Sequence, residues 1–125
     1  MNIVIDTHNE IATVDVGKMT TAKELQDAVL ALLAHPDHID GMESIFDFRE
    51  ANLLNISQED ISGYAKWLSP YLPRLAVRVA TVVSRDLEFG IIRMWNTYSE
   101  GIVDQSRMIF RDMDAAREWI LSDRS

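Results

Sequence analysis

The sequence has no cysteine among its 125 residues. A disulfide framework is therefore excluded, and so is a thiolate that acts as nucleophile or metal ligand. Basic residues are also few, because 12 Lys and Arg stand against 20 Asp and Glu, for a formal net charge of −8. Nucleic-acid binders and proteins that dock on anionic lipid draw affinity from a basic surface. The charge balance therefore disfavours nucleic acid and membrane surfaces as partners.

Catalytic motifs and long hydrophobic runs are missing as well. The chain contains neither a Walker pattern nor Gly-x-Gly-x-x-Gly, and no serine lies in Gly-x-Ser-x-Gly. The longest mainly apolar stretch, residues 75–83, contains Arg78 and is too short to span a bilayer. The first residues lack the basic and apolar regions of a signal peptide. We therefore expect a soluble cytoplasmic protein that is not an enzyme and has no cofactor.

A hairpin followed by alternating helices and strands is the pattern of the whole chain. Two β-branched runs, 3–5 and 11–16, flank a polar segment and predict two paired strands. Apolar periodicity, capping residues and prolines then predict the later elements. Four helices are expected, and they begin after Thr21, after Ser57, after Ser84 or Asp86, and after Asp112. The first should end at His35-Pro36, the second at Pro70 and Pro73, and the third at Gly101. Strands are expected at 45–48, 75–83 and 108–110.

Helix starts and apolar sides can be predicted residue by residue. Thr21 and Glu24 have the spacing of a capping box, and Ser57 is a good N-cap. Apolar residues recur at helical spacing in each expected helix and predict one apolar side. In chain order these sets are Leu25, Ala28, Val29, Leu32 and Leu33; Ile61, Ala65 and Leu68; Leu87, Ile91, Met94, Trp95 and Tyr98; and Met113, Ala116, Trp119 and Ile120.

The order of these elements predicts the fold class. Strands that alternate with helices favour parallel pairing and right-handed crossovers. The length and the ordinary composition, 47% apolar and 26% charged, predict one domain over residues 1–125. The expected fold is therefore α/β, with a mixed, mostly parallel sheet of about five strands, an N-terminal hairpin and four helices.

Several segments resemble the SpoIIAA-like (STAS-fold) family of small bacterial proteins. They are residues 78–84 (RVATVVS) with 87–94 (LEFGIIRM), residues 110–120 (FRDMDAAREWI), and Asp47-Phe48-Arg49 in the middle of the chain. The likeness covers nearly the whole chain. It implies a mixed sheet with helices packed against it, and the subfamily that the chain most resembles has no settled function.

The best-known members of that family are anti-sigma-factor antagonists, which bind a partner kinase and are switched by phosphorylation where the second helix starts. Their signature is Asp-Ser-Ser-Gly or Asp-Ser-Thr-Gly, and the nearest match here is Asp60-Ile61-Ser62-Gly63. Ile61 therefore occupies the position of the modified hydroxyl. Ser57, one turn earlier, is the alternative, although a plain N-cap role also explains it. The candidate phosphorylation sites are Ser57 and Ser62.

A ligand pocket is also expected. Ligands of α/β sheets collect at the carboxyl ends of the strands, and the second and third expected helices bring aromatic side chains to that region. We predict a pocket in the cleft between these two helices, lined by Asp47, Tyr64, Trp67, Met94, Trp95 and Tyr98. The same side chains alternatively belong to the core, or to the interface of a homodimer.

No metal site is predicted. Residues 35–40 hold two histidines and two aspartates, which are ligand types for zinc and similar ions. Pro36 breaks the helix there, however, so helical spacing does not set the ring positions, and no third histidine is near in sequence.

These patterns predict a non-catalytic binding or regulatory domain that acts through protein–protein interaction, with a homodimer as the preferred assembly. The alternative is a carrier or sensor of a small hydrophobic ligand in the cleft between the second and third helices, in contact with a membrane if the helices open. The similarity of the family to the CRAL-TRIO lipid-carrier fold implies this second function.

Overall fold

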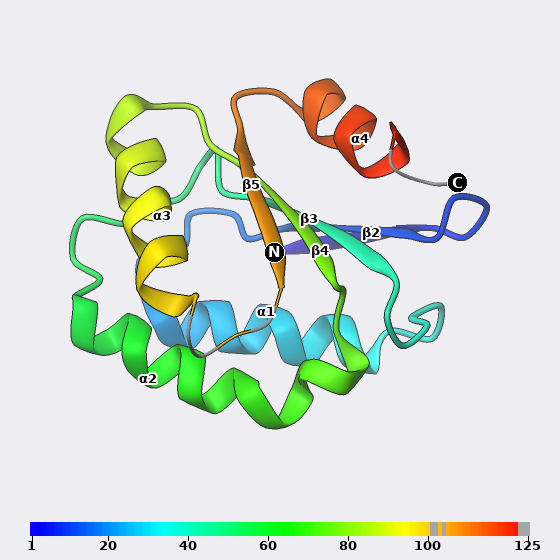
Figure 1. The fold of residues 1–125 in the computed structure, drawn as a ribbon, viewed down its shortest axis with the longest axis horizontal. Coiled ribbons are helices and arrows are strands. Elements are labelled where there is room, and N and C mark those ends of the chain that lie inside the picture. Colours follow the sequence, from blue (N-terminus) through cyan, green and yellow to red (C-terminus); the bar gives the residue numbers. More distant parts are fainter. Residues whose placement is uncertain (101–102, 104, 123–125) are drawn as a thin grey trace.

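The computed structural model describes residues 1–100, 103 and 105–122, which form one five-stranded sheet with helices on both faces (Figure 1). The strands lie in the sheet in the order of the sequence. β1 pairs antiparallel with β2, and all later neighbours are parallel. Their bounds are Asn2–Asp6 (β1), Ile11–Asp15 (β2), Glu43–Asp47 (β3), Arg78–Val82 (β4) and Ser106–Phe110 (β5). The predicted mixed sheet with an N-terminal hairpin is confirmed.

The strand order decides where the helices lie. α1, α2 and α3 each connect one strand to the next parallel strand in the same direction, so right-handed crossovers place all three on one face of the sheet. α4 follows the last strand and packs on the opposite face, as Figure 1 shows. The helices are Ala22–Ala34 (α1), Gln58–Leu68 (α2), Asp86–Ser99 (α3) and Met113–Ser122 (α4), with a 3₁₀ helix, η1, at Ser69–Arg74.

The predicted starts of α1 and α2 are confirmed. The Thr21 hydroxyl accepts a hydrogen bond from the backbone N–H of Glu24 at 3.2 Å. The Ser57 hydroxyl accepts from the N–H of Asp60 at 3.0 Å, and the Asp60 carboxylate accepts from the N–H of Ser57 at 3.1 Å. Both helices bury the apolar residues that their spacing predicted. Local capping chemistry therefore positions these two helices.

One predicted helix boundary is confirmed and another is wrong. α2 ends at Leu68, just before Pro70 as predicted, and Pro70 then occupies the first turn of η1, where a missing N–H costs no hydrogen bond. Neither Ser84 nor Asp86 caps α3: Arg85 holds the N-cap position without a side-chain cap bond. The Ser84 hydroxyl instead donates to the carbonyl of Arg49 at 2.9 Å. The helix end expected at Gly101 lies outside the described residues.

The buried face of α3 matches the prediction only in part, because Trp95 is buried and Ile91 packs against the core, but the other predicted residues do neither. Its buried residues are Glu88, Ile92, Trp95 and Ser99. Leu87, Met94 and Tyr98 are exposed instead. The helix turns this way because the Glu88 carboxylate is buried, where it accepts hydrogen bonds from the backbone N–H of Leu53 and from Arg85. A paired carboxylate can replace an apolar residue on a buried face.

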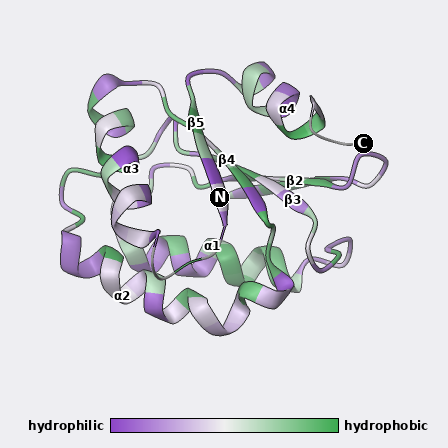
Figure 2. Cartoon of the chain, viewed as in Figure 1, coloured by the Kyte–Doolittle hydropathy of each residue, from purple (hydrophilic) through white to green (hydrophobic). Residues whose placement is uncertain are grey.

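The two faces of the sheet carry separate apolar cores. On one face α4 covers a small cluster formed by Ile11, Ile45, Ala80, Val82, Ala116 and Ile120. On the other face α1, α2 and α3 cover a larger apolar region. Figure 2 shows hydrophilic segments within β4 and β5. The sequences of these two strands include Arg78 and Arg107, respectively. Within the described residues, no helix combines the length and apolar character that a membrane crossing requires.

Candidate functional site

Successive side chains of a strand point to opposite faces of the sheet, and this alternation forms the floor of the candidate site. Ser44 of β3 pairs in register with Val79 of β4, which pairs with Arg107 of β5. One step along, Phe46 pairs with Thr81. All five side chains face α1, α2 and α3, so the floor combines apolar groups with two hydroxyls and one guanidinium.

A cavity of about 100 Å³, partly open to solvent, lies between this floor and the three helices. Its walls are mostly apolar, and its polar groups come from β3, β4, α2, the last turns of α3, and β5 with the residue before it. The helices and the segments that follow them contribute Leu25, Val29, Ile61, Tyr64, Ala65, Leu68, Leu75, Ala76, Ile92, Trp95, Asn96, Ser99, Val103 and Gln105, and Phe48 follows β3. An enclosed apolar space with a few polar groups is the usual form of a small-molecule site.

Arg107 is the one charged side chain among the described residues that line the cavity. It is partly buried, and burial lowers the pKa of its guanidinium while the neighbouring Tyr64 phenol opposes that change. No hydrogen bond or ion pair joins its side chain to any other residue of 1–100, 103 and 105–122. Gln105, also on the wall, is engaged, because its amide donates to the carbonyl of Ala76 at 2.7 Å. Arg107 therefore presents its donors to the cavity.

Tyr64 of α2 also lines the cavity, close enough to Arg107 for each group to influence the ionisation of the other. Burial raises the pKa of the Tyr64 phenol well above its ordinary value, although the positive charge of Arg107 opposes part of this rise. The phenol therefore stays protonated and can donate a hydrogen bond. Together the two side chains offer a cation and a neutral donor at the same end of an apolar cavity.

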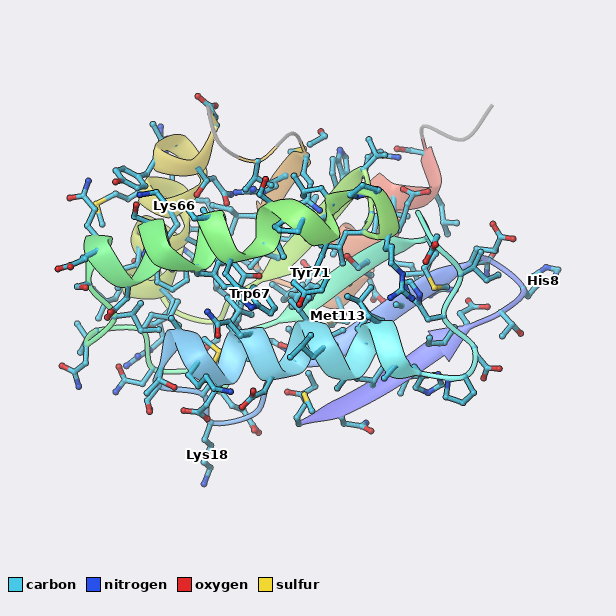
Figure 3. All side chains as sticks on the ribbon, turned by 90° about the horizontal axis from the view of Figure 1, so that it is seen from below. His8, Lys18, Lys66, Trp67, Tyr71 and Met113 are labelled. Atoms are coloured by element: carbon cyan, nitrogen blue, oxygen red, sulfur yellow. The ribbon has the colours of Figure 1, made fainter. Side chains whose placement is uncertain are left out.

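An aromatic cluster continues from Tyr64 away from the cavity. Its ring stacks on Trp67 with centroids 5.9 Å apart, and Trp67 in turn contacts Tyr71 of η1 with centroids 5.0 Å apart. Figure 3 shows Trp67 and Tyr71 between α2 and α1, while Lys66 points to the other side of α2. The cluster fills the seam between the two helices and holds Tyr64 in place.

The structure brings together two of the six predicted pocket residues. Tyr64 and Trp95 line the cavity, and Trp67 lies behind Tyr64. Met94 and Tyr98 do not line it, because they are exposed on the outer side of α3. The cavity is bounded by α1 and the sheet as well as by α2 and α3.

Asp47 does not line the cavity either. It follows Phe46 in β3 and therefore points to the opposite face of the sheet. Its carboxylate accepts two hydrogen bonds from the Arg49 guanidinium, at 3.0 and 2.9 Å, and one from the Arg49 N–H. Burial raises the pKa of Asp47, but these bonds lower it further, so that the pKa lies below its ordinary range. Asp47 thus has a structural partner.

The remaining predicted site residues have ordinary surroundings. Ser57 is exposed and acts as the cap of α2, and Ser62 is partly buried in its second turn. Phosphorylation of either serine stays a prediction. Within the part of the chain that the structure describes, no three His, Asp or Glu side chains come together in a way that could hold a metal ion.

Sequence reasoning missed Arg107 and the buried hydroxyls of Ser44, Thr81 and Ser99. Arginine and serine in a strand or helix usually indicate a solvated face. A signal was nevertheless present, because Arg107 lies two residues before Ile109 on the same strand and so shares its face. If Ile109 is identified as a core residue, the side chain of Arg107 is predicted to point inward as well.

Comparison with known proteins does not identify a family or a function for this chain. No protein-family model matches the chain, and neither the curated proteins nor the solved structures contain a significant match.

Proposed function

We propose that this protein binds a small, largely apolar molecule in the cavity between its sheet and α1, α2 and α3, as a non-catalytic carrier or sensor. The cavity itself is the observation that supports this proposal. Well-packed interiors contain few voids larger than a water molecule. A space of about 100 Å³, walled by side chains from three helices and three strands, is larger than such voids.

The size of the cavity limits the ligand. An apolar cavity of roughly 150 Å³ binds benzene, and drug-sized ligands occupy roughly 300–1,000 Å³. On the same scale the space here, about 100 Å³, encloses roughly four carbons, and its open side leaves room for the rest of a short chain. A short alkyl chain fits the site as it stands, whereas a long lipid chain requires α2 and α3 to move apart.

A cavity-filling variant tests this proposal. Hexan-1-ol titrated into the ¹⁵N-labelled protein is expected to shift the amide resonances of residues on the cavity wall. Ala65→Leu adds three carbons at a buried wall position and should abolish these shifts. Ala34→Leu makes the same change at an exposed position of α1 and should leave them intact. Equal binding by both variants, or no shift in the wild type, would contradict the proposal.

Tryptophan fluorescence gives an independent readout. Trp95 lines the cavity, whereas Trp119 packs on the opposite face of the sheet against Phe110. Ligand entry should change the emission of the wild type and of Trp119→Phe, and the change should be much smaller in Trp95→Phe. If the fluorescence change persists in Trp95→Phe but disappears in Trp119→Phe, the ligand binds on the face of the sheet opposite the cavity, and the proposal is wrong.

A second candidate function is self-association through α3. Leu87, Met94 and Tyr98 recur at seven- and four-residue spacing, and their exposed fractions are 44%, 58% and 40%. A helix stripe of this kind is self-complementary across a two-fold axis. The outer side of α2 is polar, with Gln58, Glu59, Asp60 and Lys66 exposed, so α3 alone would supply the apolar contact.

The dimer is tested by light scattering after size-exclusion chromatography. A wild type of twice the monomer mass would support it, and Met94→Glu should then run as a monomer. Leu54→Glu, which places the same charge at an exposed loop position, should remain a dimer. A wild-type protein that is monomeric at high concentration would remove this candidate.

We also propose that the chain is a SpoIIAA-like domain. The support is the mixed sheet with its N-terminal hairpin and four helices, which is the architecture that the resemblance implies. A protein partner and a phosphorylation switch belong to the same proposal. Mapping of phosphate on protein from its native host, with Ser57 and Ser62 unmodified, would remove the switch.

A further inference from the structure

The cavity wall carries one positive charge without an acidic partner. Arg107 forms no ion pair or hydrogen bond with the other described residues, and no acidic side chain is among the described residues that line the cavity. The Arg107 nitrogens keep some contact with water, but partial burial of a guanidinium without an ionic partner still costs free energy. A chain keeps such a group most readily where a ligand supplies the missing charge.

The surroundings of Arg107 determine which charge fits. The wall offers one cation, so it balances a single negative charge, whereas a phosphate monoester carries nearly two at neutral pH. A carboxylate is planar and accepts two parallel hydrogen bonds from a guanidinium. The protonated Tyr64 phenol, close enough to Arg107 for the two groups to influence each other's ionisation, is a third donor. The apolar remainder of the cavity accepts an alkyl chain.

We propose that the ligand is an aliphatic monocarboxylate, whose carboxylate is bound by Arg107 and Tyr64 and whose chain occupies the cavity under α2 and α3. This inference rests on the proposed function and specifies its ligand class. The net charge of −8 makes a specific site necessary, because the rest of the surface repels anions.

The test compares two probes that share a chain and differ in their head group. Hexanoate and hexan-1-ol are titrated separately into the labelled protein at neutral pH. Hydrogen bonds to a charged partner should make hexanoate bind ~10-fold to ~100-fold more tightly than hexan-1-ol. The preference should decline as the pH falls and the carboxyl group of the probe becomes protonated.

Variants identify the residues responsible. Arg107→Met keeps an unbranched side chain without the charge and should abolish the preference for hexanoate while retaining hexan-1-ol. Tyr64→Phe should weaken hexanoate by a few-fold to ~10-fold and leave the alcohol unchanged. Lys66→Met removes one positive charge on the far side of α2 and should behave as wild type. Because Arg107 has no partner among the described residues, Arg107→Met should fold, and its amide spectrum confirms this.

The outcomes separate the two proposals. If both probes bind the wild type equally, or if Arg107→Met retains the preference for hexanoate, the carboxylate inference is wrong and the apolar site stands. If neither probe binds the wild type, the proposed function itself is wrong. If hexanoate binding and its loss in Arg107→Met are both observed while Lys66→Met is unaffected, the inference is supported.

Discussion

Arg78 and Arg107 lie on neighbouring strands and point to opposite faces of the sheet. Arg78 is paired in register with Ser106, one residue before Arg107. Its guanidinium donates to the Glu43 carboxylate and to the carbonyl oxygens of Trp119 and Ile120, and it lies 4.2 Å from the centroid of the Trp119 ring. Arg107 has none of these contacts with the described residues. The two arginines look equivalent in the sequence but have different roles. Arg78 attaches α4 to the sheet, whereas the guanidinium of Arg107 remains available to a ligand.

The largest expected effect is on stability. Arg78→Met removes one hydrogen-bond donor from Glu43 and from each of two carbonyl groups, and it should lower the free energy of unfolding by about 3 kcal/mol. Arg107→Met removes a partly buried cation from an apolar cavity, so it should stay within about 1 kcal/mol of wild type or be more stable. Urea denaturation measures both. If both variants lose the same free energy of unfolding, Arg107 is a structural residue like Arg78, and the proposed difference between the two arginines is wrong.

A pair of alanines compares the packing of the two faces. Ala116 of α4 is fully buried in the core cluster opposite the cavity, and Ala65 of α2 lines the cavity. Ala116→Leu should cost about 1–3 kcal/mol, because no space exists for the added carbons. Ala65→Leu should cost less than about 1 kcal/mol, since the cavity accepts them. Thermal unfolding followed by circular dichroism gives both values, and a larger loss for Ala65→Leu would mean that the cavity is too narrow for any ligand.

Helix caps should act equally on both faces. Ser57 caps α2, and the Asp112 carboxylate accepts from the N–H of Ala115 at 2.8 Å at the start of α4. Ser57→Ala and Asp112→Ala should each cost about 1 kcal/mol, measured by urea denaturation. Neither change should alter hexanoate affinity. A larger effect of Ser57→Ala on affinity than on stability would assign the start of α2 to the site.

The smallest effect should be visible only in alkali. Burial raises the pKa of Tyr64 above its ordinary value of 10.0, with Arg107 opposing part of the rise, so the unfolded chain loses this proton at lower pH than the folded protein. Its contribution is complete below pH 10.0 and decreases as the pH rises above that value. Stability should therefore fall less steeply with rising pH in Tyr64→Phe than in wild type. Tyr98→Phe, at an exposed ring, serves as the control and should match wild type.

Much of the fold could be predicted because its signals are local. The α1 stripe and the Ser57 cap depend on residues within a few positions of one another, and both are confirmed. The α3 face could not be predicted in this way. Glu88 is buried through a hydrogen bond from Leu53, 35 residues away, and apolar periodicity does not register a buried carboxylate.

The candidate site was only partly predictable for the same reason. Tyr64 and Trp95 were predicted as pocket residues because they are aromatic, and both line the cavity. Met94 and Tyr98 were predicted by the same reasoning, but they are exposed. Arg107 was not predicted, because its role depends on the absence of a partner among the described residues. The sequence does not show this absence, which is established only by the position of β5 beside β4 and α2.

The cavity takes its walls from residues that extend from Leu25 to Arg107, so no single segment of the chain contains it. A molecule held there would contact three crossover helices and three strands simultaneously, so its binding would link all six elements. Occupancy should therefore raise the midpoint of one cooperative melting transition and slow hydrogen exchange across β3, β4 and β5 together. The filled protein would behave as a more rigid body than the empty one.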